Sequence, residues 1–261
     1  GYRDAVYSVI KVNPSLSIVE PDADAQALLA GYSSKIDEFS SKIIGSVSED
    51  LCLERIPGQG KSKMCDPSKT AKNGSDISNI VAQAFRAMSN SSDIAIQNGG
   101  GTRVDVAAGD YTLGDAYTLL PFSNTIVELS MTGQEIKNVL EDALDYALSP
   151  DGSTGAYPYA AGLRWDVDSS KAKGDRISNL EFKGRSDSSW SSLNMSQMYT
   201  VATNNYISSG KDGYLTFGDI SKEGRVVDTY LGYAQSFVDY VKKVGTIKKL
   251  PLSEYSTQSF K

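Results

Sequence analysis

The sequence predicts an α+β domain in which helices flank mixed β-sheets, preceded by one long helix. Segments with the three- and four-residue spacing of amphipathic helices alternate irregularly with short runs typical of strands. Neither a βαβ order nor an internal repeat organises them, which favours the α+β class. The 261 residues are 40% hydrophobic and 22% charged, an ordinary globular composition with room for a sizeable core.

The long helix is expected over residues 21–45, as a connector that enters the main domain at 46–261. P-D-A-D places Asp22 and Asp24 near a helix N-terminus, whose partial positive charge favours carboxylates, and Gly45 lies near its expected end. Apolar residues recur along one face of this segment: Ala25, Leu28, Leu29, Tyr32, Ile36, Phe39 and Ile43.

In the first half of the main domain, D-I-S-N-I-V-A-Q-A-F-R-A-M predicts a helix over residues 76–88. D-I-A-I-Q and T-I-V-E-L-S-M predict strands. Thr132 and Glu135 form a capping box, because a threonine at the N-cap and a glutamate three residues later satisfy each other's backbone amides. A second helix is therefore expected to begin at this point.

In the second half, strands are expected at L-R-W-D-V-D, I-S-N-L-E-F and Y-T-V-A-T. Glycine-rich loops are expected at 149–162 and 204–217. A final helix is expected near Thr229–Val244, with these residues facing inward: Tyr230, Tyr233, Ala234, Phe237 and Val241.

Charge and composition exclude several function classes. The net charge is -6 and no long run of Lys or Arg occurs, which disfavours nucleic acid or an anionic membrane as a partner. No stretch approaches the roughly 20 apolar residues of a membrane span, and residues 1–20 do not resemble a signal peptide.

Histidine is absent from the whole sequence. Because histidine is the usual proton carrier near neutral pH and the commonest metal ligand, Ser-His-Asp, Cys-His and histidine-based metal sites are excluded within this chain. A carboxylate-only Mg²⁺ or Ca²⁺ site at Asp22–Asp24 stays open, although these residues more often mark a helix start.

Cys52 and Cys65 are the only cysteines, and the segment between them holds proline and glycine and no regular pattern. A disulfide closing this loop would stabilise the fold by about 3 kcal/mol in the chain-entropy model and would imply an oxidising compartment. Two buried free thiols are the alternative. We predict the disulfide.

N-G-G-G-T-R over residues 98–103 matches neither the dinucleotide fingerprint nor the P-loop. Three consecutive glycines indicate a sharp turn or a close approach of the backbone. Their amides beside Arg103 offer a corner for an anion. A tight strand exit, with Arg103 in a surface ion pair, is the alternative.

Two further segments carry residue types suited to a nucleoside. L-P-F-S-N contains Phe122, and N-N-Y-I-S-S-G-K-D-G-Y contains Tyr206 and Asp212. An aromatic face can stack on a base, and a carboxylate can accept hydrogen bonds from two ribose hydroxyls. Taken singly, these residues are more readily explained as core, exposed loop and turn residues than as functional ones.

The order of these segments resembles the C-terminal domain of the 5′-nucleotidase family. N-G-G-G-x-R is followed by L-P-F-x-N, a strand, a T-G-x-E helix, G-x-Y-P-Y-x-x-G and N-x-Y-x-x-x-G-x-D-G-Y. The resemblance covers roughly residues 46–250. It implies that residues 1–20 are the remnant of a junction with an N-terminal metallophosphoesterase domain. In the family, that domain holds two divalent metal ions and the second domain binds the nucleotide.

By position, the resemblance implies that Phe122 and Tyr206 sandwich the base and that Asn98 contacts the base or sugar edge. Arg103 then lies at the ribose and phosphate, and Asp212 on the ribose hydroxyls.

Gly162, in P-Y-A-A-G-L, matches a glycine that lines the sugar pocket. Arg55, in C-L-E-R-I-P-G, is the candidate for an upstream arginine, with Lys61 or Lys63 as alternatives.

The resemblance implies an inactive specificity domain of a two-metal nucleotidase, located outside the cytoplasm in the periplasm or at the cell surface of a bacterium. E-R-I-P-G is closest to bacterial members, some of which hydrolyse NAD as well as nucleoside monophosphates. AMP, a UDP-sugar, NAD and a cyclic phosphodiester stay open as substrates. A stand-alone nucleoside-binding module is the alternative function, and a scaffold domain that has lost the pocket is a third.

Overall fold

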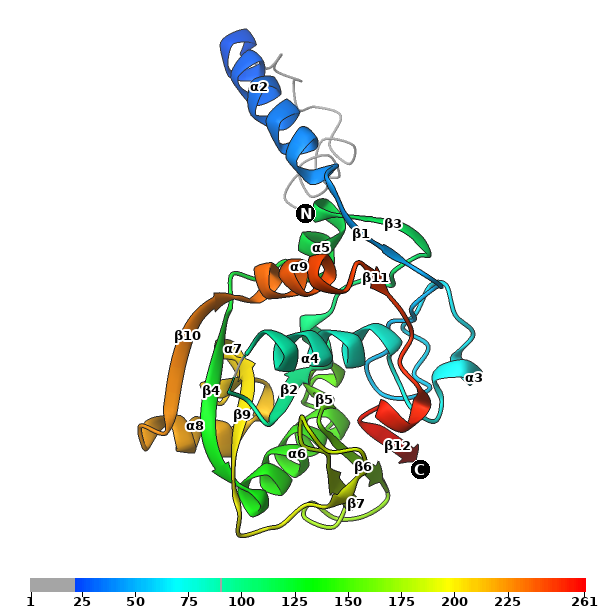
Figure 1. Cartoon of the computed structure of the whole chain (residues 1–261), viewed down its shortest axis with the longest axis vertical. Coiled ribbons are helices and arrows are strands. Elements are labelled where there is room, and N and C mark those ends of the chain that lie inside the picture. The colour runs from blue at the N-terminus through cyan, green and yellow to red at the C-terminus, as the bar shows by residue number, and fades with distance from the viewer. Residues whose placement is uncertain (1–21, 90) are drawn as a thin grey trace, which may run out of the picture. The chain divides into compact units, whose positions relative to one another are not determined.

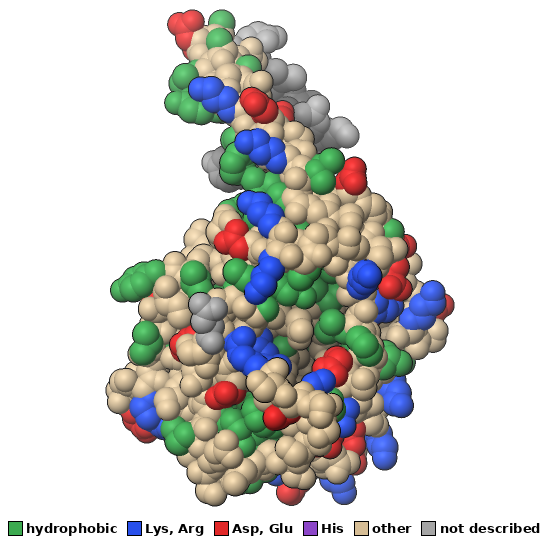
Figure 2. Space-filling view, in the orientation of Figure 1, with side chains coloured by type: hydrophobic (Ala, Val, Ile, Leu, Met, Phe, Trp, Pro, Cys, Tyr) green, Lys and Arg blue, Asp and Glu red, His purple; other side chains and the backbone are tan. Residues whose placement is uncertain are grey.

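The computed structural model describes residues 22–89 and 91–261, and the chain divides into two compact units, Gly1–Ser41 and Lys42–Lys261. The described part of the first unit contains helix α2, Ala23–Ser40, whose first turn is capped by the Asp22 carboxylate accepting from the Ala25 amide. Its apolar side chains Leu28, Leu29, Tyr32 and Ile36 are exposed, and Figure 2 shows hydrophobic groups along this helix. The junction expected at residues 1–20 lies outside the described residues.

The predicted end of this helix at Gly45 is wrong. The helix ends at Ser40, and Gly45 belongs to strand β1, Ile43–Val47. β1 pairs in parallel with β11 (Thr246–Ile247) and antiparallel with β3 (Gly109–Thr112). Pairing with strands distant in the sequence therefore overrides the helical spacing of the apolar residues.

The second unit is α+β, as predicted, with three sheets (Figure 1). The central sheet has the order β10-β4-β9-β2-β5, formed by Val226–Gly232, Thr125–Thr132, Met198–Asn204, Ile94–Asn98 and Pro158–Ala161. Its β2–β9 pair is parallel and the other pairs are antiparallel, so the sheet is mixed. A four-stranded sheet consists of β12, β6, β7 and β8, at Thr257–Phe260, Leu163–Val167, Ile177–Phe182 and Ser191–Ser192.

The core lies on both faces of the central sheet, because successive side chains of a strand point to opposite faces. Ala95, Ile126 and Ala202 pack with α4 (Asp76–Met88) and α9 (Tyr233–Val244). The opposite face of the sheet packs with α6 (Gly133–Leu148), α8 (Leu215–Lys222) and the four-stranded sheet. The shorter helices are α3 (Pro67–Thr70), α5 (Leu113–Leu119) and α7 (Asn205–Ser208), with 3₁₀ turns at Gly99–Gly101, Thr154–Ala156, Lys211–Gly213 and Leu252–Glu254.

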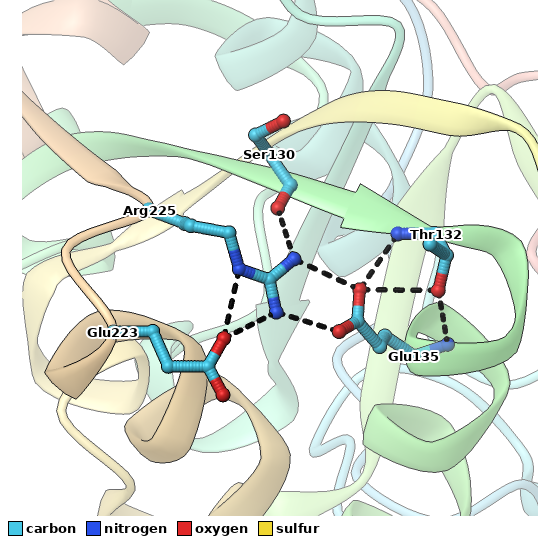
Figure 3. A network of polar contacts seen from close by, with 5 residues as sticks. All are labelled: Ser130, Thr132, Glu135, Glu223 and Arg225. Atoms are coloured by element: carbon cyan, nitrogen blue, oxygen red, sulfur yellow. Dashed lines mark hydrogen bonds and ion pairs between the residues drawn. The ribbon is translucent and has the colours of Figure 1, made fainter.

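Several predicted elements are confirmed. The helix at 76–88 and the strands of D-I-A-I-Q, T-I-V-E-L-S-M and Y-T-V-A-T form where expected. The capping box is present, with the Thr132 hydroxyl accepting from the Glu135 amide and the Glu135 carboxylate accepting from the Thr132 amide. Arg225 joins this box through Glu135 and also donates to Ser130 and Glu223 (Figure 3).

Three boundaries differ from the prediction. The expected loop at 149–162 includes strand β5, and the expected loop at 204–217 forms α7, a 3₁₀ turn and the start of α8. The final helix begins at Tyr233, since Val226–Gly232 pairs with β4 as an edge strand. Tyr230, expected to face inward, is 85% exposed and has a φ of 58° at an irregularity in this pairing.

Candidate functional site

The functional segments meet at one edge of the central sheet because of its strand directions. β2 and β9 are parallel neighbours, so their carboxyl ends, at Asn98 and Asn204, lie at the same edge. β4 and β5 run antiparallel to these strands, so the residues that precede Thr125 and Pro158 arrive at the same edge. Four segments far apart in the sequence therefore converge here.

A cavity of about 320 Å³ lies at this convergence. It is lined by Arg55, Asn98, Gly100, Gly101, Arg103, Phe122, Asn124, Ser153, Gly155, Tyr206 and Asp212. Six of the seven residues selected from the sequence for substrate binding are in this set. Their convergence is a feature of the tertiary structure, since no two of the segments that carry them are joined by a short connection.

Two aromatic side chains line the cavity from different segments. Phe122, after α5, is 44% exposed, and Tyr206, in α7, is 43% exposed. Large aromatic side chains with this exposure are not core residues, so the core alternative for Phe122 is wrong. Their faces are available to a flat, partly apolar ligand.

Asp212 is the acidic residue of the cavity, and both of its carboxylate oxygens are held. The Asn98 amide donates to Oδ2 at 2.9 Å and the Tyr206 hydroxyl donates to Oδ1 at 3.1 Å. Asp212 has a φ of 53°, between Gly210 and Gly213 with φ of 87° and 77°. Burial and then the nearby Asp212 raise the pKa of Tyr206, so its hydroxyl keeps the proton that it donates.

Two arginines supply positive charge to the same cavity. Arg103 donates to the Gly100 carbonyl at 3.0 Å, and its guanidinium lies 5.6 Å from the centre of the Phe122 ring. Burial, followed by repulsion from Arg103, lowers the pKa of Arg55. Within residues 22–89 and 91–261, neither guanidinium forms an ion pair with a carboxylate. The two cations therefore favour an anion in the cavity.

Arg55 is positioned by its backbone. The buried Glu54 carboxylate accepts from the amides of Arg55, Gly60 and Lys61 at 2.9–3.1 Å, and the Tyr159 hydroxyl donates to the Arg55 carbonyl at 2.9 Å. The predicted disulfide is present between Cys52 and Cys65 and closes this loop.

The alternative cations of this loop do not reach the cavity. Lys61 and Lys63 are exposed and are not among its lining residues. Arg55 is therefore the residue of the loop that the structure places in the cavity.

The three glycines pack closely against other parts of the protein. A Cβ on Gly99 would lie 3.2 Å from the Tyr159 ring, on Gly100 3.1 Å from the Gly155 carbonyl, and on Gly101 2.2 Å from the Tyr233 hydroxyl. Their Cα hydrogens thus face protein atoms. Packing within the protein therefore requires glycine at these positions, and Gly100 and Gly101 also line the cavity.

Gly162 is not in the cavity, and its expected place in a sugar pocket is not supported. It has a φ of 75° between β5 and β6, and a Cβ there would lie 2.7 Å from the Arg86 guanidinium carbon. Glycine is required at this position by the turn and by the neighbouring arginine side chain.

Sequence reasoning missed three lining residues, Asn124, Ser153 and Gly155. Asn124 ends the L-P-F-S-N motif, so its position in that motif was an available signal. Gly155 leaves room for Arg55, since a Cβ there would lie 2.4 Å from a guanidinium nitrogen. Nothing in the local sequence indicates that contact.

The family model described as 5′-nucleotidase, C-terminal domain, matches residues 55–219. The Haemophilus influenzae NAD 5′-nucleotidase is 35% identical over 244 residues, which cover 92% of this chain and 40% of that protein. A probable 5′-nucleotidase of Treponema pallidum is 32% identical over 246 residues, with the same coverage of both.

Among solved structures, the Haemophilus influenzae NAD nucleotidase superposes with a TM-score of 0.75 at 34% identity, over 99% of this chain and 45% of that chain. The chain belongs to the 5′-nucleotidase C-terminal domain family. It spans about two fifths of the length of the curated relatives named above.

Among the residues that the structure describes, no group of three or more His, Cys, Asp or Glu side chains is arranged to hold a metal ion. None of the described helices is both long and apolar enough to cross a membrane.

Proposed function

We propose that this chain is the nucleotide-binding domain of a 5′-nucleotidase that hydrolyses phosphate esters of AMP-like nucleotides, with NAD and UDP-sugars as further candidates. The observation that carries the proposal is the gathering in one cavity of two exposed aromatics, one carboxylate and two arginines that form no ion pair with the other described residues. These groups match the three parts of a nucleotide, which are a flat base, a sugar diol and an anionic phosphate.

Each group has a defined part in binding. Phe122 and Tyr206 stack on the base, and Asp212 accepts hydrogen bonds from the ribose hydroxyls. Asn98 and the missed Asn124 are amides at the edge of the cavity, where they can read a base or sugar edge. Arg103 and Arg55 bind the phosphate as cationic donors.

Hydrolysis itself belongs to a different domain in this proposal. The two divalent metal ions would be held by an N-terminal metallophosphoesterase domain, where they polarise the phosphoryl group and activate water. The role of this chain is to hold the nucleoside so that the phosphate can be presented to those metals. The Cys52–Cys65 disulfide supports an extracytoplasmic location, since disulfides persist in oxidising compartments.

The test is isothermal titration of this chain with adenosine, AMP, NAD and uridine. Replacing Tyr206 by Ala should weaken adenosine binding roughly 5- to 150-fold, because stacking contributes about 1–3 kcal/mol per base, whereas Tyr206→Phe should keep most of the affinity. Tyr230→Ala is the matched control, since this exposed tyrosine is not in the cavity.

Equal losses of adenosine affinity in Tyr206→Ala and Tyr230→Ala would contradict the proposal that the cavity binds the nucleoside. Failure of the unmodified chain to bind any of the four ligands at millimolar concentration would contradict the claim that it contains the nucleoside site.

A further inference from the structure

A hydrogen-bonded chain of side chains connects the interior of the sheet to the cavity. The Asn204 amide donates from Nδ2 to Oδ1 of Asn98 at 3.2 Å, and Asn98 Nδ2 donates to Oδ2 of Asp212 at 2.9 Å. The Tyr206 hydroxyl donates to the other oxygen of Asp212 at 3.1 Å. The chain therefore starts at Asn204 and ends on the carboxylate.

The orientation of both amides follows from the groups at the two ends of this chain. A carboxylate oxygen can only accept, so Asn98 must turn its NH₂ group toward Asp212 and its carbonyl toward Asn204. At the other end, Asn204 Oδ1 accepts from the Ile207 amide at 3.0 Å, and a backbone N–H can only donate. Asn204 must then turn its NH₂ group toward the Asn98 carbonyl. The two ends require the same arrangement.

Asn204 does not itself reach the cavity. It is 1% exposed, it is not among the lining residues, and its side chain caps the first turn of α7. Asn98 lines the cavity but is only 5% exposed. Asn204 can therefore influence a ligand by two routes, through its amide donor to Asn98 and through its cap on the turn of α7 that carries Tyr206.

The consequence for Asp212 is a defined set of free acceptor positions. Each carboxylate oxygen has about two lone-pair positions, and each already accepts one hydrogen bond, from Asn98 or from Tyr206. One position then remains on each oxygen, and two adjacent acceptors suit the two hydroxyls of a ribose cis-diol. A reversed Asn98 amide would instead turn its carbonyl oxygen toward the carboxylate.

We propose that Asn204 is a positioning residue that gives the cavity its preference for ribonucleosides over nucleosides without the 2′- and 3′-hydroxyls. It acts by holding the Asn98 amide in the orientation that anchors Asp212. This inference rests on the proposed function, because it assumes that the cavity binds a nucleoside.

The test compares adenosine with 2′,3′-dideoxyadenosine by isothermal titration. In the unmodified chain, adenosine should bind about tenfold or more tightly than the dideoxy compound, because hydrogen bonds to a charged group are the strong ones. Asn204→Asp keeps the size and the helix cap but replaces the amide donor by an acceptor. Its ratio of the two affinities should fall to about one, while the affinity for the dideoxy compound stays within about twofold.

Two companion variants separate positioning from charge and from folding. Asn205→Asp introduces the same charge at the adjacent exposed residue and should keep the tenfold ratio. Asn204→Ser retains a good N-cap, but serine is too short to reproduce the contact with Asn98. Its ratio of adenosine to dideoxyadenosine affinity should therefore also fall to about one. Asn204→Ser decides the question if Asn204→Asp does not fold, with folding checked by thermal unfolding.

The outcomes distinguish this inference from the proposed function. Unchanged ratios in both Asn204 variants, or equal losses for the two ligands in a folded variant, would overturn the positioning role and leave the nucleoside site in place. Failure of the unmodified chain to bind adenosine would overturn the proposed function itself. Equal binding of both ligands by the unmodified chain would show that Asp212 does not read the ribose.

Discussion

The main electrostatic feature of the cavity is that two arginines and one aspartate supply its charged side chains. The pKa of Arg55 is lowered first by its burial and then by repulsion from Arg103. Asp212 is the acidic residue among the lining side chains. The cavity therefore has more cationic than anionic groups. In the proposed function, a bound phosphate would relieve this imbalance.

Replacing Arg103 by Ala should weaken AMP binding tenfold or more, because a charge-assisted donor to the phosphate is lost. Adenosine, which has no phosphate, should lose less. Titration of both ligands against the unmodified chain and against Lys243→Ala, an exposed cation at the end of α9, measures the difference. AMP affinity that is unchanged in Arg103→Ala would remove this residue from the site. The loss should shrink at high salt, since Arg103 is exposed to solvent.

Among the elements, the start of α6 shows how a local sequence signal is reinforced by a distant residue. The capping box of Thr132 and Glu135 is encoded within four residues, but the Glu135 carboxylate also pairs with Arg225 at 2.6 Å (Figure 3). The hydrogen bonds from Arg225, together with those from Thr132, lower the pKa of Glu135 to about 2. The network joins α6, on one face of the central sheet, to the segment between α8 and the edge strand β10.

Glu135→Gln should reduce the free energy of unfolding at pH 7 by about 1 kcal/mol, since glutamine can still complete the capping box but cannot pair with Arg225 as an anion. The pKa of Glu135 is lower in the folded protein than its ordinary value of 4.5. The stabilisation of the folded state by the Glu135 carboxylate is therefore complete above about pH 5 and is lost as the pH falls toward 2.

Urea unfolding of the variant and the unmodified chain at pH 7, 4 and 3 measures this dependence. The difference in the free energy of unfolding between the two proteins should be largest at pH 7 and should fall by more than half at pH 3. Asp219→Asn, which removes an exposed pair with Lys222, is the control and should change stability by less than about 0.5 kcal/mol. A difference that does not vary with pH would mean that charge pairing is not the source of the effect.

At the scale of the whole molecule, the question is how the chain functions when it covers about two fifths of its relatives' length. The residues that line the cavity all belong to the unit Lys42–Lys261. Hydrolysis in the proposed function uses metal ligands that include histidine, and this sequence contains no histidine. Binding and hydrolysis should therefore be separable by experiment.

We expect the 261-residue chain to bind AMP but to release no phosphate from it in the presence of Mg²⁺, Mn²⁺ or Zn²⁺. The longer protein, encoded by a reading frame that extends upstream into Asp, His and Asn metal motifs, should release phosphate, and Tyr206→Ala should raise its KM. Phosphate release by the chain alone would contradict the division of labour. A reading frame without such motifs would favour the stand-alone binding module.

Much of the fold could be predicted because its signals are local. The helix at 76–88 and the capping box depend on residues within a few positions of one another, and both form as expected. The errors fall where pairing with a distant strand decides the outcome. The final helix is expected to begin near Thr229, but Val226–Gly232 pairs with β4, and Gly45 lies at a helix's expected end but belongs to β1.

The sequence by itself determined the residue types of the candidate site and their order, since six of its selected residues line one cavity. It also limited any disulfide within the chain to one pairing, because only two cysteines are present, and the structure has that bond. Only the tertiary structure decided that Gly162 belongs elsewhere, that Gly155 makes room for Arg55, and that Asn204 supports Asn98. These are contacts between segments brought together by strand direction and pairing, and such contacts leave no periodicity or spacing in the chain from which they could be predicted.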